Sequence, residues 1–200
     1  MQTEIYRIED YRSGRKLVFL DEGAPAFCLY SKEVKKFELK EGMKISDELY
    51  GELVTLLSKR ARERCLYLLD DMARTEYQLR KKLEGDHYPE EAIDNAVSYC
   101  REKHYIDDED YAKRYISSKS ASLSRRMMEK KLMEKGISRE IISEAFEDVP
   151  VCETETVRSL IEKKYGDTSG LSFEERQKII RRFANAGFAY DAVRQAFDHD

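Results

Sequence analysis

The chain has 200 residues, of which 41% are hydrophobic and 38% charged, and its formal net charge is −4. This length holds one good-sized domain or a few small ones, and the composition, with 3 Pro, 9 Gly and no Trp, favours a helix-rich fold. No run of 18 apolar residues occurs, and no apolar stretch follows a basic start, which excludes a membrane span and argues against a secretory signal. We therefore expect a cytoplasmic protein.

Four cysteines lie along the chain at Cys28, Cys65, Cys100 and Cys152, separated by 37, 35 and 52 residues. A structural zinc site needs closely spaced ligand pairs such as C-x-x-C, and the sequence has none. Nothing else in the sequence indicates an oxidising compartment, so we expect four reduced thiols and no metal or other cofactor. Cys65 and Cys100 fall on apolar stripes of predicted helices and are interpreted as small core residues.

Residues 1–45 predict a small β-rich extension. Short runs of β-branched and aromatic residues are separated by turn residues, notably Ser13-Gly14. The predicted strands lie around residues 5–8, 17–20 and 26–30. Ser31 is expected to cap a short helix over residues 32–38.

From Ser46 onward the pattern is helical almost to the end of the chain. Ser46 precedes two acidic residues, an arrangement that suits the exposed amide groups and positive dipole of a helix start. Thr75 with Gln78, and Ser172 with Glu175, have the spacing of a capping box, in which the hydroxyl accepts an amide and the longer side chain reaches back. These signals predict helix starts at three places.

An internal repeat with a period near 50 is the most informative feature of the sequence. The apolar anchors Leu83, Leu132 and Phe183 lie 49 and 51 residues apart, and equivalent apolar positions follow each of them. The expected helices span residues 58–73, 75–86 and 89–103, then 107–121, 124–135 and 138–148, then 153–166, 172–186 and 189–198. We predict a mainly α fold of three tandem three-helix modules in an elongated array, preceded by the β-rich segment.

The expected domain organisation follows from this repeat. The β-rich extension covers residues 1–45, a linker helix and the first module 46–105, the second module 106–150, and the third module 151–200. A module of this size buries little surface alone, so we expect neighbouring modules or the N-terminal part to stabilise it.

The turn after each middle helix carries aligned residues, namely His87, Gly136 and Gly187. Glycine suits a helix end that needs a left-handed residue. His87 breaks this pattern, and we expect the neighbouring Gly85 to serve the first module instead.

Charge is distributed in blocks of alternating sign. Net charges are +4 over residues 59–82, −8 over 84–112, +6 over 113–135 and −5 over 136–156. A basic pair precedes each anchor: Lys81-Lys82, Lys130-Lys131 and Arg181-Arg182, with Arg125 and Arg126 on the second middle helix. Such a ladder can meet a polymer or a repeating acidic surface. Ordinary solvated helix faces account for it equally well.

Three motifs taken together resemble a known family over about residues 58–200. They are Arg74-Thr75-x-x-x-Leu79-x-x-Lys82-Leu83, Tyr105-Ile106-Asp107-Asp108-x-x-Tyr111-Ala112-x-x-Tyr115 and Lys131-Leu132-x-x-Lys135-Gly136-Ile137. The chain is similar in these motifs to the RecX family, regulatory proteins of the bacterial RecA recombinase. It departs from the family pattern at His104, where a small residue is common, and at Ser122-Leu123-Ser124, where a Gly-containing turn is usual.

The resemblance implies that the protein binds the RecA–DNA filament, lies along its groove, and inhibits recombinase ATP hydrolysis, strand exchange and filament growth. Our hypothesis is that the basic ladder contacts the filament or its DNA. Asp107 and Asp108 would help to dock a protomer, although a helix start explains these two residues without any partner. We expect a monomer, because no long heptad seam is present.

A direct DNA-binding protein is the alternative. Three-helix modules with a tight turn are similar to helix-turn-helix units, and a middle helix rich in Arg can approach phosphates. The net charge of −4 argues against strong sequence-independent affinity, because phosphate neutralisation supplies most of that affinity. Weak DNA contact is compatible with both hypotheses.

Nothing in the sequence indicates an enzyme. It carries no G-x-x-x-x-G-K-[ST] phosphate loop and no H-E-x-x-H motif, and its three histidines share no ligand spacing. Adjacent carboxylates such as Asp70-Asp71 diverge by about 100° on a helix and do not face one substrate. We therefore expect no catalytic activity.

Overall fold

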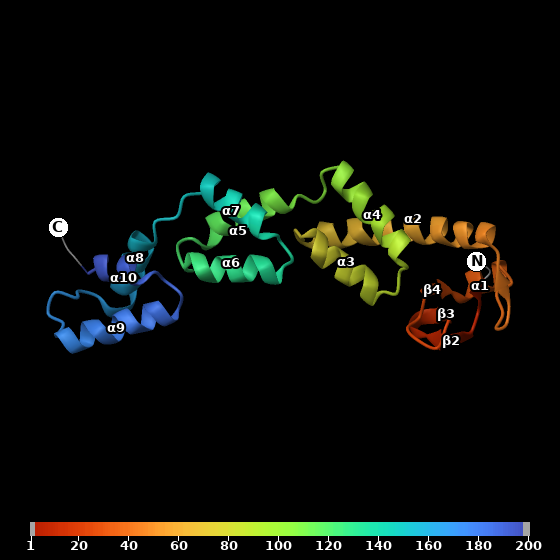
Figure 1. Ribbon diagram of the computed structural model, residues 1–200, viewed down its shortest axis with the longest axis horizontal. Coiled ribbons are helices and arrows are strands. Elements are labelled where there is room, and N and C mark those ends of the chain that lie inside the picture. Colours follow the sequence, from red (N-terminus) through yellow and green to blue (C-terminus); the bar gives the residue numbers. More distant parts are fainter. Residues whose placement is uncertain (1–2, 198–200) are drawn as a thin grey trace. The chain divides into compact units, whose positions relative to one another are not determined.

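The computed structural model describes residues 3–197, which form two compact units divided between Asp107 and Asp108 (Figure 1). The first unit combines the β-rich segment with three helices and a short helix α1. Its elements are β1 (Thr3–Glu4), β2 (Arg7–Tyr11), the 3-10 turn η1 (Arg12–Gly14), β3 (Arg15–Phe19), β4 (Phe27–Tyr30), α1 (Ser31–Lys36), β5 (Lys44–Ile45), α2 (Asp47–Asp71), α3 (Glu76–Gly85) and α4 (Glu90–Glu102).

The strands form two small antiparallel sheets. β2, β3 and β4 pair in that order, and β1 pairs with β5. The strand predicted around residues 5–8 begins later, at Arg7, because the chain changes sheets just before it. The Ile5 amide donates to the Met43 carbonyl, whereas the Tyr6 amide donates to the Phe19 carbonyl.

The prediction that Ser31 caps a helix is wrong, since α1 begins at Ser31 itself. The Ser31 hydroxyl donates instead to the Gly14 carbonyl at 2.9 Å, which ties the helix to the turn between β2 and β3. The Glu33 carboxylate accepts from the Tyr30 amide at 2.7 Å and so satisfies the helix start.

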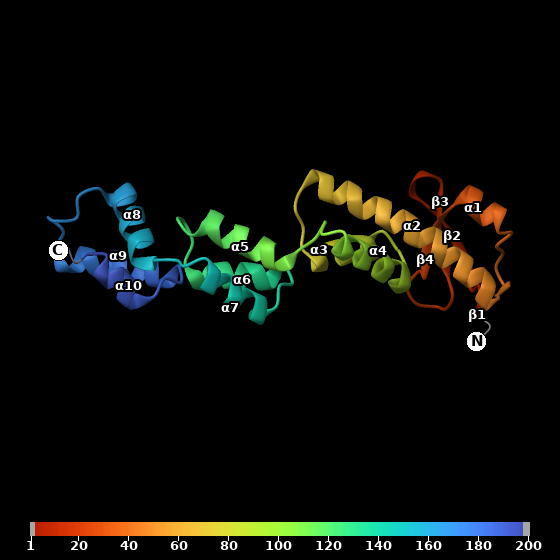
Figure 2. The same ribbon diagram turned by 90° about the horizontal axis from the view of Figure 1, so that it is seen from above.

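Helix α2 is one continuous helix of 25 residues, not a linker helix followed by a module helix. Ser46 caps it as predicted, accepting from the Leu49 amide at 3.2 Å. Its first half places Leu53 and Leu57 in the core beneath the strands, and its second half places Ala61 and Cys65 in the core of the first module. Figure 2 shows α2 running past both parts. This shared helix is how the small module gains the stabilising neighbour that its size requires.

The second unit contains two three-helix modules. Its elements are α5 (Asp108–Lys119), α6 (Arg125–Glu134), α7 (Arg139–Asp148), α8 (Glu153–Tyr165), α9 (Phe173–Asn185) and α10 (Tyr190–Gln195). We call α5–α7 module 2 and α8–α10 module 3; module 1 is the second half of α2 with α3 and α4. The predicted capping boxes at Thr75 and Ser172 are both formed. The predicted last helix extended to residue 198, which lies outside the described residues.

Leu132 and Phe183 lie in the separate apolar cores of modules 2 and 3, as Leu83 does in module 1. The turn after each anchor closes in the same way. The amide five residues later donates to the anchor carbonyl: Tyr88 to Leu83 at 3.1 Å, Ile137 to Leu132 at 3.2 Å, and Phe188 to Phe183 at 3.2 Å. This is the six-to-one hydrogen bond of a helix end that turns through a left-handed residue.

The left-handed residues are His87, Gly136 and Gly187, with φ of 61°, 83° and 93°. The expectation that Gly85 takes this role is therefore wrong; Gly85 is the last residue of α3. His87 is held in the strained conformation by tertiary contacts. Its carbonyl accepts from the Cys28 amide at 3.0 Å, and its ring lies edge-on to Tyr11 with centroids 5.5 Å apart.

Candidate partner-binding surface

The three basic pairs lie on the middle helices α3, α6 and α9, each directly before its buried anchor. All six side chains are exposed except Lys131, which is half-buried. Some of this charge is matched locally. Lys81 pairs with Glu84 at 2.7 Å, Arg125 with Glu129 at 2.9 Å, and Lys130 approaches Glu134 at 3.9 Å.

Four of the predicted basic residues have no ion-pair partner within the described part of the chain. They are Lys82, Arg126, Lys131 and Arg181. Arg182 has no ion pair within residues 3–197, where its side chain donates to the Tyr165 hydroxyl at 3.5 Å. These five cations are the ones whose charge remains available to a partner.

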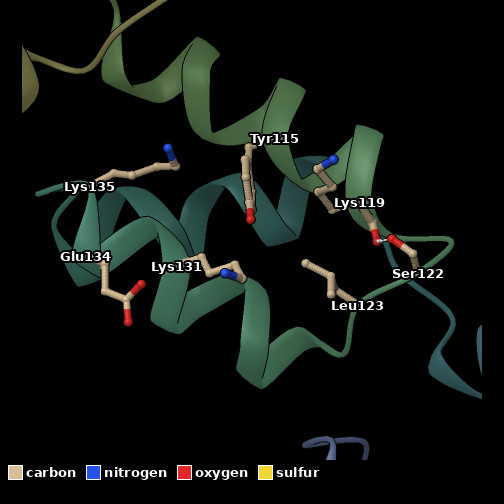
Figure 3. Close-up of a pocket in the computed structure, with 7 residues that line it drawn as sticks. All are labelled: Tyr115, Lys119, Ser122, Leu123, Lys131, Glu134 and Lys135. Carbon is tan, nitrogen blue, oxygen red and sulfur yellow. Dashed lines mark hydrogen bonds between the residues drawn. The ribbon is translucent and has the colours of Figure 1, made fainter.

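In module 2 the structure places Lys131 in a hollow between α5 and α6, which we call the lysine hollow (Figure 3). The hollow has a volume of about 620 Å³. It is lined by Tyr115, Lys119, Ser122, Leu123, Lys131, Glu134 and Lys135. Figure 3 shows the Tyr115 ring pointing from α5 toward α6, with Lys131 and Leu123 on the facing side.

The lysine hollow is electropositive, because three lysines face one carboxylate, that of Glu134. Burial raises the pKa of Tyr115, and neighbouring Tyr111 and Glu134 add to the effect, so its hydroxyl stays protonated at neutral pH and can donate a hydrogen bond. Lys135 also lies 5.6 Å from the Tyr111 ring centroid. Cations and a hydroxyl donor above a partly apolar floor suit a carboxylate or phosphate group.

In module 1, the position equivalent to Lys135 carries an acidic residue. The residue that follows α3 is Asp86, where Lys135 follows α6. Asp86 accepts from Arg64 at 2.8 Å, so the charge there is neutralised internally. In module 3 the corresponding residue is Ala186. Lys135 of the lysine hollow therefore has no basic counterpart at this position in modules 1 and 3.

Sequence reasoning singled out Lys131 but missed its grouping with Lys119. Lys119 is the last residue of α5 and Lys131 lies in the last turn of α6. A net charge of +6 over residues 113–135 was the only signal, and charge density alone does not tell which side chains converge.

Asp107 and Asp108 lie at the start of α5. The helix begins at Asp108, and acidic residues occupy its first turn, where the exposed amides favour negative charge. Both residues interact with neighbouring groups of the chain. This placement supports the interpretation as a helix start, and a docking role stays a prediction.

The thiols of Cys65 and Cys100 lie in the apolar core of module 1. Cys65 and Cys100 are completely buried, which confirms them as core residues. Their mutual hydrogen bond and burial raise the pKa of the Cys65 thiol, so it stays protonated at neutral pH. Among residues 3–197 no three His, Cys, Asp or Glu side chains gather as metal ligands, and no helix has the length and apolar character needed to cross a bilayer.

The architecture defines a class of protein built from tandem three-helix domains. Residues 61–100, 107–145 and 152–197 match, in order, the first, second and third three-helix domains of RecX. The chain is 32% identical over 195 residues to the regulatory protein RecX of Caldanaerobacter subterraneus subsp. tengcongensis, covering 96% of each chain. It is 28% identical over 186 residues to that of Clostridium botulinum, covering 88% of this chain and 85% of the relative.

Solved structures agree on the fold. A crystal structure of a regulatory protein RecX matches with a TM-score of 0.66 at 23% identity, covering 98% of this chain and 100% of that one. RecX from Lactobacillus salivarius matches with a TM-score of 0.64 at 21% identity, covering 71% and 95%. The chain belongs to the RecX family of regulatory proteins.

Proposed function

We propose that this protein binds the RecA–DNA filament and inhibits recombinase ATP hydrolysis, strand exchange and filament growth. The observation that carries the proposal is the repeated placement of a basic pair, in one register, on three modules of a RecX-family chain. A filament presents the same surface on every protomer. Linked modules can therefore occupy successive copies, and each contact raises the effective concentration of the next.

Complementary charges orient the protein on the filament. The unpaired cations Lys82, Arg126, Lys131 and Arg181 attract an acidic protein surface or a DNA phosphate. The acidic start of α5 at Asp107 and Asp108 would face a basic patch of a protomer. Alternation of the two signs sets the register, because a shifted complex places like charges together.

The proposal is tested by the single-strand-DNA-dependent ATPase of the cognate RecA, titrated with this protein from substoichiometric to equimolar amounts. We expect ATP hydrolysis to fall as the protein is added, because occupied filament can neither turn over nor grow. An ATPase rate that stays constant at every ratio contradicts the proposal.

A charge-reversal pair locates the contact. The double variant Lys130→Glu and Lys131→Glu should weaken inhibition while leaving helicity, measured by circular dichroism, unchanged. Between the single variants, Lys131→Glu should weaken inhibition more, since Lys131 lines the lysine hollow and lacks an ion pair, whereas Lys130 already faces Glu134. If the double variant inhibits as strongly as the unmodified protein, α6 is not part of the contact with the filament.

Filament binding and direct DNA binding are distinguished by a binding assay without recombinase. The assay measures binding to short duplex and single-stranded DNA across a range of salt concentrations. For a filament-binding protein with net charge −4 we expect weak binding that salt abolishes. Tight, sequence-selective binding would favour the DNA-binding alternative.

A further inference from the structure

A single carboxylate joins the two modules of the second unit. Glu153, the first residue of α8, accepts from the Arg125 amide through Oε1 at 2.7 Å and from the Ala189 amide through Oε2 at 3.0 Å. Arg125 is the first residue of α6, and Ala189 immediately precedes α10. One negative charge therefore satisfies exposed amides at two helix starts while standing at the start of a third.

Two further hydrogen bonds cross the same junction. The Ser124 hydroxyl accepts from the Met127 amide as the cap of α6 and donates to the Ala186 carbonyl at the end of α9, at 3.0 Å. Ser124 is 1% exposed, so this donation is shielded from water. The Thr156 hydroxyl donates to the Ser120 carbonyl at 2.9 Å.

Close backbone approach accompanies these bonds. A Cβ atom placed on Gly187 would lie 2.8 Å from the Ser124 hydroxyl oxygen and 3.6 Å from the Arg126 Cβ. The end of α9 thus meets the start of α6. Arg182 lies four residues before Ala186, about one helical turn from this contact, and Arg126 lies directly beside it.

The junction therefore joins two modules whose basic residues are far apart in the sequence. Arg126 belongs to module 2, Arg181 and Arg182 belong to module 3, and all three side chains are exposed. The hydrogen bonds of Glu153 and Ser124 cross between these two modules, which the chain itself connects through residues 149–152.

We propose that modules 2 and 3 present one rigid composite basic surface, built around Arg126, Arg181 and Arg182, and that Glu153 is the positioning residue that holds it. This inference rests on the proposed function for its partner, a protein surface that carries acidic groups at a fixed spacing. A rigid surface binds such a partner without ordering two independent modules, which is the cost that preorganisation removes. A flexible link between the modules would lower the effective concentration of the second contact.

The test replaces Glu153 with Gln and compares it with Glu155→Gln. Glu155 lies on the same helix, is exposed, and loses the same charge on substitution. Spin labels at Ser117→Cys in α5 and Glu174→Cys in α9 report the distance between modules 2 and 3. Cys152 is replaced by Ser for this purpose, since it is the exposed cysteine, whereas Cys28, Cys65 and Cys100 are buried.

We expect Glu153→Gln to broaden the distance distribution and to raise the concentration needed for half-inhibition of the RecA ATPase by about tenfold, as one linked contact becomes independent. Glu155→Gln should change neither. Glu153→Asp, one methylene shorter, should lie between Glu153→Gln and the unmodified protein. Unchanged helicity of the Gln variant excludes unfolding as the cause.

Three results overturn the inference. An unchanged distance distribution in Glu153→Gln shows that Glu153 does not hold the modules. A broadened distribution with unchanged inhibition shows that a rigid surface is not needed for binding. If the unmodified protein leaves the ATPase unaffected, the proposed function fails and the basic surface loses its partner, and the distance measurement alone then decides whether Glu153 holds the two modules.

Discussion

The two compact units join their parts by different physical means. In the first unit, α2 belongs to two cores at once, so the β-rich segment and module 1 are coupled by apolar burial along one helix. In the second unit, modules 2 and 3 are coupled at a polar junction where Glu153 and Ser124 satisfy helix ends. Apolar burial supplies more stabilisation, and directed hydrogen bonds supply more geometric definition. A three-helix module can thus be joined to its neighbour in two ways. A shared apolar helix adds stability, and a polar junction fixes the position of one module against the next.

The largest expected effect comes from breaking α2 between its two cores. Lys59 is exposed and lies between Leu57 and Ala61, which face different cores. Lys59→Pro removes a helical hydrogen bond and adds a steric clash, at a cost of about 3 kcal/mol or more. Hydrogen exchange should show loss of protection in the strands and in module 1 together, with α5–α10 unaffected.

Lys59→Ala is the control for this change, and its effect on the free energy of unfolding should stay within about 0.5 kcal/mol because the side chain is on the surface. If Lys59→Pro exposed only the strands or only module 1, the two parts would be independent. That outcome would contradict the coupling that we ascribe to α2.

A smaller effect is expected at the polar junction. Gly187 has φ of 93° and lies against Ser124, whereas Gly14 has φ of 70° with no atom within 4 Å of a Cβ position. Gly14→Ala should cost about 1–2 kcal/mol from backbone strain alone. Gly187→Ala should cost about 2–3 kcal/mol, because the added methyl group also displaces Ser124.

Chemical denaturation of both glycine variants measures this difference. The excess cost of Gly187→Ala reports how tightly the end of α9 is held against α6. Equal costs for the two substitutions would mean that the junction yields readily, which is the opposite of the rigid coupling proposed for modules 2 and 3.

The smallest effect concerns two left-handed histidines in the first unit. His104 has φ of 54° and is exposed, and His87 has φ of 61° and packs against Tyr11. His104→Gly relieves backbone strain and removes a side chain that lies in solvent, so it should stabilise the protein by about 0.5–1 kcal/mol after the entropy cost of glycine. The midpoint of urea unfolding measures this gain.

His87→Gly is the matched comparison. It should stabilise less than His104→Gly, or destabilise, because relief of strain is offset by removal of the ring that packs against Tyr11. A larger gain at His87 than at His104 would show that the Tyr11 contact contributes nothing to the attachment of module 1 to the sheet.

Local signals predicted the helices well. Thr75 and Ser172 cap their helices as their neighbours three residues on indicated, and Leu83, Leu132 and Phe183 occupy equivalent turns. Such features depend on contacts within five residues, so their information is present in short stretches of sequence. The continuity of α2 was missed because the repeat suggested a boundary that the helix itself does not have.

The surface was predicted less completely than the fold. The basic pairs were recognised from their recurrence, but Tyr115 and Lys119 were not assigned to a common site with Lys131. Glu153 had no local signal at all, since its two hydrogen-bond partners lie 28 and 36 residues away in the chain.

The amino-acid sequence by itself determined the helical modules and their number, because these depend on periodicity and on neighbours along the chain. Its three motifs carried the resemblance to the RecX family, which the family models confirm. The tertiary structure alone decided which cations are paired, how Lys119 and Lys131 come to line one hollow, and how Glu153 joins two modules. These properties arise from hydrogen bonds and packing between segments that are distant in sequence, and such contacts exist only once the chain has folded.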